Sequence, residues 1–203
     1  MRILKADLTS LEQTVDFLKQ GGVVIHPTDT CYGMAVDITN PQAIQKIYAL
    51  KKMSLQKPMS ILVADFAMLE KYGKLSAKAR EIAQKYLPGA LTLVLPKTEN
   101  VPAFYAPEND FIGLRLPRQN LSLDLVQKLG NPITTTSANL TGQVQAYTPA
   151  EVLNYFQETE VLFLDGGILP QKKPSTILKC VDDFCEIIRQ GDLLIQSFEE
   201  NVT

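Results

Sequence analysis

Apolar and polar residues recur along the chain with two different periods, and these periods predict strands and helices in alternation. Short apolar runs bounded by Pro, Gly, Asn or Asp are typical of buried strands. Apolar residues spaced three and four apart are typical of helices with one buried face. The strands predicted in this way cover residues 23–26, 34–37, 59–63, 91–95, 112–116, 133–136, 161–164, 176–179 and 186–189.

The predicted helices begin at side chains that cap helices. Ser10 with Gln13, and Thr148 with Glu151, have the spacing of a capping box. The helix that begins at Ser10 is expected to stop at Gly21, because glycine is common just past a helix end. The other predicted helices, which include those capped by the polar residues at positions 40 and 65, cover 40–50, 65–72, 76–87, 123–129 and 148–156.

Interleaved strands and helices predict an α/β domain. Several neighbouring strands are joined by loops too short for a crossover helix, so we expect a twisted sheet with both parallel and antiparallel pairs, flanked by helices. The chain of 203 residues has no internal repeat, linker or low-complexity tract, so residues 1–203 are expected to form a single domain. Its hydrophobic content of 45% is sufficient for a full core.

Charge and cysteine content narrow the class of protein. A net charge of −2 does not indicate a nucleic-acid-binding protein, although a local basic cleft is compatible with it. The three cysteines form no Cys-x-x-Cys motif, and an odd number without a signal peptide indicates a reducing cytoplasm. No apolar stretch reaches the ~20 residues that cross a bilayer. We therefore expect a cytoplasmic protein with no membrane partner.

The segment 22–33 is the first candidate for a functional site. Thr28, Asp29 and Thr30 follow an apolar strand directly. Open α/β sheets bind ligands at the carboxyl ends of buried strands. By itself, the segment is better explained as a strand followed by a Thr/Asp turn. The only histidine, His26, lies inside the strand, and we interpret it as a packed imidazole.

Several cationic residues occupy the ends of predicted strands and helices. Arg115 lies between Leu114 and Leu116 in a predicted strand, so its guanidinium points to the face opposite to that of the two leucines. A charge on an apolar strand needs either a buried ion pair or a wet cleft, and the sequence leaves both open. Lys51, Lys52 and Lys57 cluster after a predicted helix, where cations are also common because of the helix dipole.

A run of hydroxyl side chains at 134–137, followed by Asn139, ends another apolar strand. Four consecutive hydroxyls exceed what a turn requires, and such groups suit phosphate oxygens, a carboxylate or a base edge. The sequence contains no P-loop, no G-x-G-x-x-G leading into a helix and no H-E-x-x-H. A bound nucleotide would therefore be held by another arrangement.

These segments occur together in one known family. The chain contains, in this order, PTDTCYG, KPMSILV, PGALTLVL, IGLRLP, TTSANLTG, DGG followed by PSTI, and IIRQG. In this order and spacing they resemble the YrdC-type threonylcarbamoyl-AMP synthases, over about residues 2–189 with a short C-terminal tail. Each motif alone has low specificity, whereas seven in order are a specific match. The resemblance implies the YrdC-like α/β fold and the short form of the family.

The resemblance also implies an activity. Family members are nucleotidyltransferases that convert L-threonine, bicarbonate and ATP into L-threonylcarbamoyl-adenylate and pyrophosphate. The downstream tRNA threonylcarbamoyl transferase machinery would then use the product to modify an adenosine in tRNA. Mg²⁺ is expected on the ATP phosphates, held mainly by phosphate oxygens and water and not by a dedicated protein metal site. Because every reactant is anionic or loses a proton, fixed cations and hydrogen-bond donors suffice for this chemistry.

The same resemblance implies roles for individual residues. The residues expected to be catalytic are Lys51, Arg115 and Ser137. Those expected to bind L-threonine are Thr28, Thr30 and Arg115. Those expected to bind ATP are Lys51, Lys57, Thr135, Ser137, Asn139 and Arg189.

Three positions depart from the family pattern. Met53 stands where an arginine is usual, Leu62 stands where some members have a histidine, and the stretch 144–148 lacks a serine that is common there. The absence of the arginine at position 53 resembles the pattern of the YciO-like branch. One alternative function is therefore that of a nucleotide-binding relative with another activity. An RNA-binding module is a second. The net charge and the lack of an aromatic and basic stripe indicate at most weak RNA binding.

Overall fold

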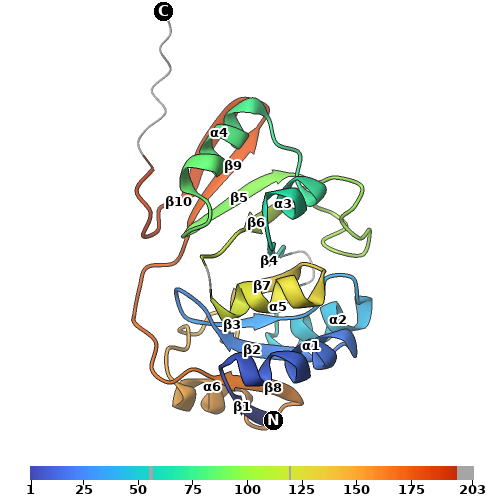
Figure 1. Cartoon of the computed structure of the whole chain (residues 1–203), viewed down its shortest axis with the longest axis vertical. Helices are drawn as coiled ribbons and strands as arrows, with labels where there is room; N and C mark the ends of the chain where they lie inside the picture. Colours follow the sequence, from blue (N-terminus) through green and yellow to red (C-terminus); the bar gives the residue numbers. More distant parts are fainter. Residues whose placement is uncertain (55–56, 119, 196–203) are drawn as a thin grey trace, which may run out of the picture.

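The strands of this protein join into one sheet that runs the length of the molecule (Figure 1). The computed structural model describes residues 1–54, 57–118 and 120–195. The strands in these ranges are β1 (Arg2–Lys5), β2 (Val23–Pro27), β3 (Tyr32–Ala35), β4 (Ser60–Leu62), β5 (Leu91–Pro96), β6 (Phe111–Arg115), β7 (Ile133–Ser137), β8 (Val161–Asp165), β9 (Thr176–Val181) and β10 (Phe184–Arg189).

The sheet is mixed, which confirms the predicted fold class. Its strand order is β1-β8-β2-β3-β7-β4-β6-β5-β9-β10. The pairs β1–β8, β2–β8, β4–β6 and β5–β9 are parallel, and the other neighbours are antiparallel. Short loops, such as the one between β2 and β3, produce the antiparallel pairs, because a parallel pair needs a longer crossover.

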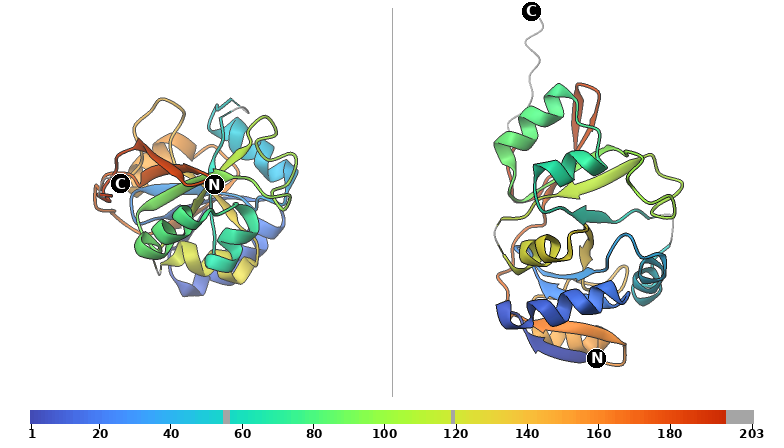
Figure 2. Two further views of the ribbon diagram at one scale, coloured as in Figure 1. Left: turned by 90° about the horizontal axis from the view of Figure 1, so that it is seen from above. Right: turned by 45° about the vertical axis from the view of Figure 1, so that its right-hand side comes forward.

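Helices cover both faces of the sheet. They are α1 (Leu11–Lys19), α2 (Pro41–Leu50), α3 (Phe66–Tyr72), α4 (Ala77–Tyr86), α5 (Leu121–Leu129) and α6 (Pro149–Phe156), with a 3-10 turn, η1 (Leu8–Ser10), before the first. Seen along the long axis, α1 and α5 lie on one side of the sheet and α2 and α6 on the other (Figure 2). None of the helices in the described ranges has the length and apolar character needed to cross a membrane.

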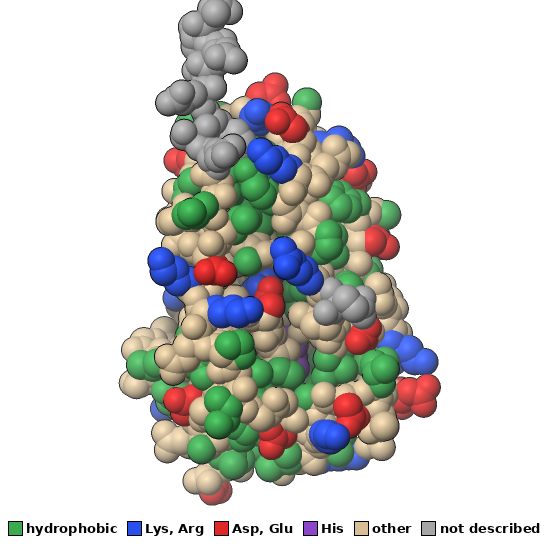
Figure 3. Space-filling view, turned by 60° about the vertical axis from the view of Figure 1, so that its left-hand side comes forward, with side chains coloured by type: hydrophobic (Ala, Val, Ile, Leu, Met, Phe, Trp, Pro, Cys, Tyr) green, Lys and Arg blue, Asp and Glu red, His purple; other side chains and the backbone are tan. Residues whose placement is uncertain are grey.

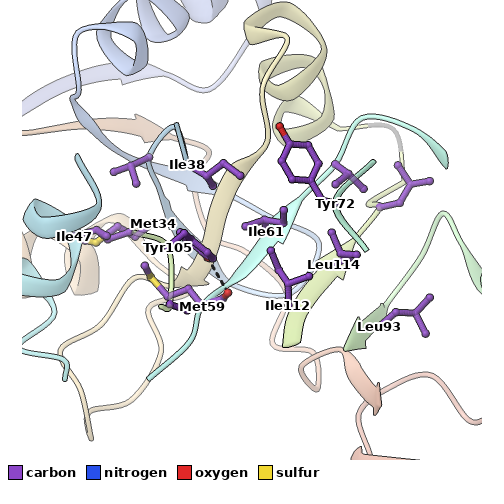
Figure 4. Packing of buried hydrophobic residues seen from close by; sticks show 14 of the residues in the cluster. Met34, Ile38, Ile47, Met59, Ile61, Tyr72, Leu93, Tyr105, Ile112 and Leu114 are labelled. Atoms are coloured by element: carbon purple, nitrogen blue, oxygen red, sulfur yellow. Dashed lines mark hydrogen bonds between the residues drawn. The ribbon is translucent and has the colours of Figure 1, made fainter. Parts of the chain in front are cut away.

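Alternation along the strands divides the core into two layers. In β2, Val24 packs into the layer of α1 and α5, whereas Val23 and Ile25 belong to the layer of α2 and α6. Figure 4 shows part of the second, larger layer, in which the buried Tyr105 hydroxyl donates to the Met59 carbonyl at 2.8 Å. Both faces of the central strands are therefore buried, as their nearly continuous apolar runs predict.

Most of the predicted helix caps are confirmed. The side chains of Asn40, Asp65 and Thr148 each accept a hydrogen bond from a backbone N–H in the first turn of the helix that follows. The prediction at Ser10 is wrong, because its side chain makes no capping bond. Asp7 instead caps η1 by accepting from the Thr9 N–H, and α1 continues from that turn.

The sequence pattern misses two features of the fold. One is β1, an edge strand whose residues are mostly exposed and which is held by parallel pairing with β8. The other is a disulfide between Cys180 and Cys185, which are direct partners across β9 and β10. Cys31 is a free, buried thiol. The odd number of cysteines gives no indication of this pairing, because the pairing depends on strand register.

Candidate functional site

A polar cavity of about 340 Å³ lies on the face of the sheet that α5 partly covers. Strand register explains its polar floor. Leu62, which packs into the layer of α5, pairs with both Arg115 and Ile133, and residues directly opposite one another share a face of the sheet. The period of two along each strand then brings further polar side chains to this face. The floor consists of Ser60, Thr92, Arg115, Thr135 and Ser137.

The turn between β2 and β3 forms one wall of the cavity. The Thr28 hydroxyl donates to the Cys31 carbonyl at 2.6 Å and accepts from the Thr30 and Cys31 N–H groups at 3.1 and 3.2 Å. Thr28 therefore holds the turn together, as the turn interpretation requires. Thr28 and Thr30 also line the cavity, so the two interpretations of this segment are compatible.

Arg115 combines the two roles that the sequence leaves open. One of its terminal nitrogens, Nη2, donates to the Asp29 carboxylate in an ion pair, and the arginine side chain is only 8% exposed. The guanidinium nevertheless lines the cavity, and its Nε has no hydrogen-bond partner among the described residues. Asp29 thus fixes one edge of the guanidinium and leaves other donors for a ligand.

Lys51 joins the end of α2 to the end of β7. Its ammonium donates to the Ser137 carbonyl and, at 2.9 Å, to the Asn139 carbonyl. Its side chain lines the cavity and is almost fully buried. Burial lowers the pKa of the Lys51 ammonium to about 8. At neutral pH the group is therefore mostly charged and can meet an anion while it holds the backbone.

This pKa predicts a pH dependence for nucleotide binding. Above pH 8 Lys51 loses its proton, so the affinity for ATP should fall with rising pH, by at most about tenfold per pH unit. Calorimetric titration with ATP across the range measures the effect. Lys51→Arg keeps its charge throughout and should show a flat profile. A wild-type profile as flat as that of the arginine variant would contradict the expected contact between the Lys51 ammonium and ATP.

Ser137 and Asn139 have different roles, although they lie two residues apart. Asn139 is almost fully buried, and its amide donates to the Leu140 and Gln143 carbonyls at 3.0 and 2.7 Å. Its side-chain oxygen accepts from the Ser137 hydroxyl at 2.5 Å. Both residues line the cavity. Asn139 mainly fixes the loop, whereas Ser137 is partly exposed on the cavity floor.

We expect Ser137→Ala to lower turnover while leaving the melting temperature nearly unchanged. Asn139→Ala should lower both, because it removes the hydrogen bonds that the Asn139 amide donates to the Leu140 and Gln143 carbonyls, at about 0.5–1.5 kcal/mol each. Thermal unfolding and steady-state turnover of the two variants, compared side by side, test the distinction. Equal melting temperatures for the two variants would contradict the structural role given to Asn139.

Arg189, at the end of β10, also lines the cavity. Its Nε and Nη2 donate to the Ser175 carbonyl at 3.2 and 2.8 Å, and the Ser175 hydroxyl lies 2.9 Å from the Thr92 hydroxyl. Burial, followed by the nearby charge of Arg115, lowers the pKa of Arg189. Thr92 and Ser175 also line the cavity, although neither is among the site residues predicted from the sequence. The signal for Thr92 is a single hydroxyl within the apolar strand at 91–95.

The remaining predicted residues also line the cavity, although their environments differ. Lys57 is exposed at its mouth and Thr135 lies on its floor. Met53 lines the cavity and packs against the larger core layer. The structure therefore brings together every site residue named from the sequence.

The charge of the cavity indicates an anionic ligand. Its cations are Lys51, Lys57, Arg115 and Arg189, and no Asp or Glu is among the described residues that line it. Figure 3 shows several Lys and Arg side chains at mid-height on one face of the molecule, with Asp and Glu side chains among them. In residues 1–54, 57–118 and 120–195 no three His, Cys, Asp or Glu side chains come together in a way that could hold a metal ion.

Comparisons with known proteins identify the family of this chain. A family model described as telomere recombination, and named for Sua5, YciO and YrdC, matches residues 16–191. A Methanocaldococcus jannaschii protein, named provisionally as a threonylcarbamoyl-AMP synthase, is 34% identical over 200 residues, which are 97% of this chain and 94% of that protein. The threonylcarbamoyl-AMP synthase of Photobacterium profundum is 30% identical over 187 residues, 91% of this chain and 100% of that protein.

Two solved structures show the same fold. The Pyrococcus abyssi Sua5 structure with L-threonine has a TM-score of 0.85 and 27% identity; the match covers 94% of this chain but 56% of that one. Escherichia coli YciO has a TM-score of 0.83 and 26% identity, and the match covers 94% of both chains. The motifs, the fold and the matched length agree, and the chain belongs to the Sua5/YciO/YrdC family.

Proposed function

We propose that this protein is a nucleotidyltransferase that makes L-threonylcarbamoyl-adenylate and pyrophosphate from L-threonine, bicarbonate and ATP. The observation that carries the proposal is the cavity itself: four cationic side chains and a floor of hydroxyls, with no carboxylate among its described lining residues. Relatives named threonylcarbamoyl-AMP synthase, and a structural neighbour with L-threonine, support the choice of substrates.

The proposed reaction has two steps. The neutral amine of threonine adds to bicarbonate with loss of water, or to CO₂ with loss of a proton, and becomes a carbamate. A carbamate oxygen then attacks the α-phosphorus of ATP, the bond from that phosphorus to the bridging oxygen breaks, and pyrophosphate leaves. Negative charge gathers on the phosphates throughout, so fixed cations that need no rearrangement lower the barrier.

The residues divide between the two substrates. Arg115, with Thr28 and Thr30, would bind the threonine carboxylate and amine beside the β2–β3 turn. The ATP phosphates would lie between Lys51 and Arg189, which both line the cavity. The remaining contacts proposed for ATP come from Lys57, Thr135, Ser137 and Asn139.

Mg²⁺ fits this site only as an ion that enters bound to the phosphates of the nucleotide. The described lining offers hydroxyl, amide and carbonyl oxygens but no carboxylate, so the triphosphate and water would supply most of its ligands. When bound, the ion would neutralise phosphate charge. The product would pass to the downstream tRNA threonylcarbamoyl transferase machinery, and we propose that this occurs in the cytoplasm.

The direct test is to incubate the protein with ATP, Mg²⁺, bicarbonate and labelled L-threonine. We expect labelled threonylcarbamoyl-adenylate and an equal amount of pyrophosphate, and neither product without bicarbonate. ATP binding without any coupling to threonine, and without product, would contradict the proposal. That result would favour a nucleotide-binding relative of the YciO type.

Met53 provides a further test of the nucleotide site. Met53→Arg should strengthen ATP binding by about 1 kcal/mol, because a guanidinium at the cavity wall adds a forked donor for phosphate. Threonine affinity measured without nucleotide should barely change. Calorimetry on wild type and variant measures both. If ATP affinity is unchanged or lower, the arginine side chain has stayed against the core instead of turning to the cavity.

A further inference from the structure

A disulfide joins the last two strands of the sheet, and the cavity residue Arg189 lies at the end of one of them. Cys180 in β9 and Cys185 in β10 are direct partners, with their Cα atoms 4.2 Å apart. This spacing is close to that of an ordinary antiparallel pair whose two residues share no hydrogen bond. The strands themselves therefore bring the two sulfurs together, so the bond can form and break without refolding of the domain.

β10 is an edge strand, and little apart from β9 holds it in place. It is the last strand in the order of the sheet, and its residues other than Cys185 are exposed. Figure 1 shows β9 and β10 at one end of the molecule, with α4 beside them. The register of a strand is strongly specified where one face is buried and weakly specified where neither is. Side-chain packing alone therefore gives β10 little preference for its observed register.

The turn between these strands adds little to the specification of register. It consists of Asp182 and Asp183, of which Asp182 has a φ of 51° and Asp183 has no positive φ. In a two-residue hairpin turn this combination favours glycine at the first place, and the chain has none there. The disulfide, one pair beyond the turn, therefore fixes a register that the turn and the packing specify only weakly.

A bulge in β10 decides which way Arg189 points. β9 advances by three residues from Cys180 to Ile177, whereas β10 advances by four between their partners. The extra residue lies between Ile187 and Arg189, where the register shifts. In a regular strand these two residues would share a face. The bulge instead places Arg189 on the face of its partner Ile177, which also lines the cavity.

The bulge is held at both of its ends. On the far side, Arg189 donates to the Ser175 carbonyl, and the Gly191 N–H donates to the Thr176 hydroxyl at 2.9 Å. On the near side, the disulfide holds the two strands together. Because β10 has one residue more than β9 between these anchors, it has to bulge there. Without the disulfide, β10 can shift along β9 by one residue, lose the bulge and turn Arg189 away from the cavity.

We propose that Cys180 and Cys185 form a thiol–disulfide modification site that sets the affinity of the cavity for ATP. The disulfide holds Arg189 in the cavity and gives the form that binds tightly, whereas the dithiol form binds ATP more weakly. The proposal rests on the proposed function, because it uses the ATP contact given there to Arg189. In the cytoplasm, where we propose that the reaction occurs, disulfides are usually transient or redox-sensing.

The oxidant and the reductant of this site are a small-molecule disulfide and its thiol. Cys185 is partly exposed and Cys180 is buried, so exchange begins at the Cys185 sulfur. On oxidation, the Cys185 thiolate attacks the small disulfide and displaces one small thiol. The Cys180 thiolate then attacks the mixed disulfide at the Cys185 sulfur and displaces the second. Two electrons and two protons thus pass from the cysteines to the small molecule, and reduction runs through the same mixed disulfide in reverse.

The test compares full-length protein equilibrated with oxidised glutathione and with reduced glutathione. Alkylation followed by mass spectrometry should count one free thiol in the oxidised protein and three in the reduced protein. ATP calorimetry should show about tenfold tighter binding to the oxidised form, the usual effect of one hydrogen-bonded contact to a charged group. Equal ATP affinities, or three free thiols after oxidation, would overturn the proposal. If neither form binds ATP, the proposed function itself fails.

Three variants locate the effect. Cys185→Ser keeps the size of the side chain but forms no disulfide, so it should bind ATP like the reduced wild type under both conditions. Arg189→Ala should bind ATP weakly in both forms, without a difference between them, because the disulfide acts through this side chain. Cys31→Ala is the matched control, since it removes the free cysteine, and it should keep the difference. A difference that persists in Arg189→Ala or disappears in Cys31→Ala would contradict the proposal.

Discussion

Arg115→Ala should weaken threonine binding by on the order of 2–4 kcal/mol and leave ATP binding much less affected, because the variant loses a charge-assisted, forked contact to one substrate. Calorimetric titrations with each substrate measure the two effects separately. Arg115→Lys should recover little, because an ammonium cannot reproduce the planar fork of a guanidinium. Equal losses for both substrates would contradict a dedicated threonine contact.

The ion pair with Asp29 adds a stability effect that has to be separated from binding. In Arg115→Ala the Asp29 carboxylate loses its partner, but its side chain is 26% exposed and can meet water. We therefore expect a moderate fall in melting temperature. The double variant Arg115→Ala with Asp29→Asn removes the unpaired charge and should regain stability without regaining threonine affinity. Recovery of affinity together with stability would mean that Arg115 acts only through the fold.

Lys51→Met should have the second large effect, on both stability and turnover. The ammonium holds the Ser137 and Asn139 carbonyls, which are left without this donor when the charge is removed. The expected loss of stability is about 2–3 kcal/mol. Turnover should fall by about 10²–10³, the usual effect of removing one electrostatic contact to a reacting group. Thermal unfolding and the formation of pyrophosphate measure the two quantities.

Lys52 provides a matched control for this variant. It is the next residue in the chain, it is exposed, and it does not line the cavity. Lys52→Met removes the same charge from the same loop and should leave stability and turnover nearly unchanged. If the two variants lose activity equally, the effect comes from the general charge of the loop. That result would contradict the specific role that we predict for the Lys51 ammonium.

The sequence by itself determines the elements and most of their ends. Periodicity predicts the strands and helices, and the caps at Asn40, Asp65 and Thr148 work because each acts within one turn of its own helix. The same local reasoning fails at Ser10, where Asp7 starts a 3-10 turn three residues earlier. It also misses β1, which becomes a strand only through its partner β8.

In the candidate site, too, the sequence predicts one part and only the fold shows the other. The motifs of the sequence predict which side chains form the site, and every predicted site residue lines the cavity. Their partners come from distant parts of the chain: Asp29 for Arg115, the carbonyl of Ser137 for Lys51, and Ser175 for Arg189. A pattern of residue types contains no information on such distances.

Tertiary structure alone decided which side chains share a face and which atoms remain without a partner. Strand register places Arg115 beside Leu62 and His26 beside Gly33, and a shift by one residue would turn each side chain to the other face. Register in turn depends on the packing of both core layers, which involves the whole chain. For this reason the sequence shows His26 only as a packed imidazole, whereas the fold shows that its Nδ1 lies near the Ser122 hydroxyl and that its Nε2 is buried without a partner among the described residues.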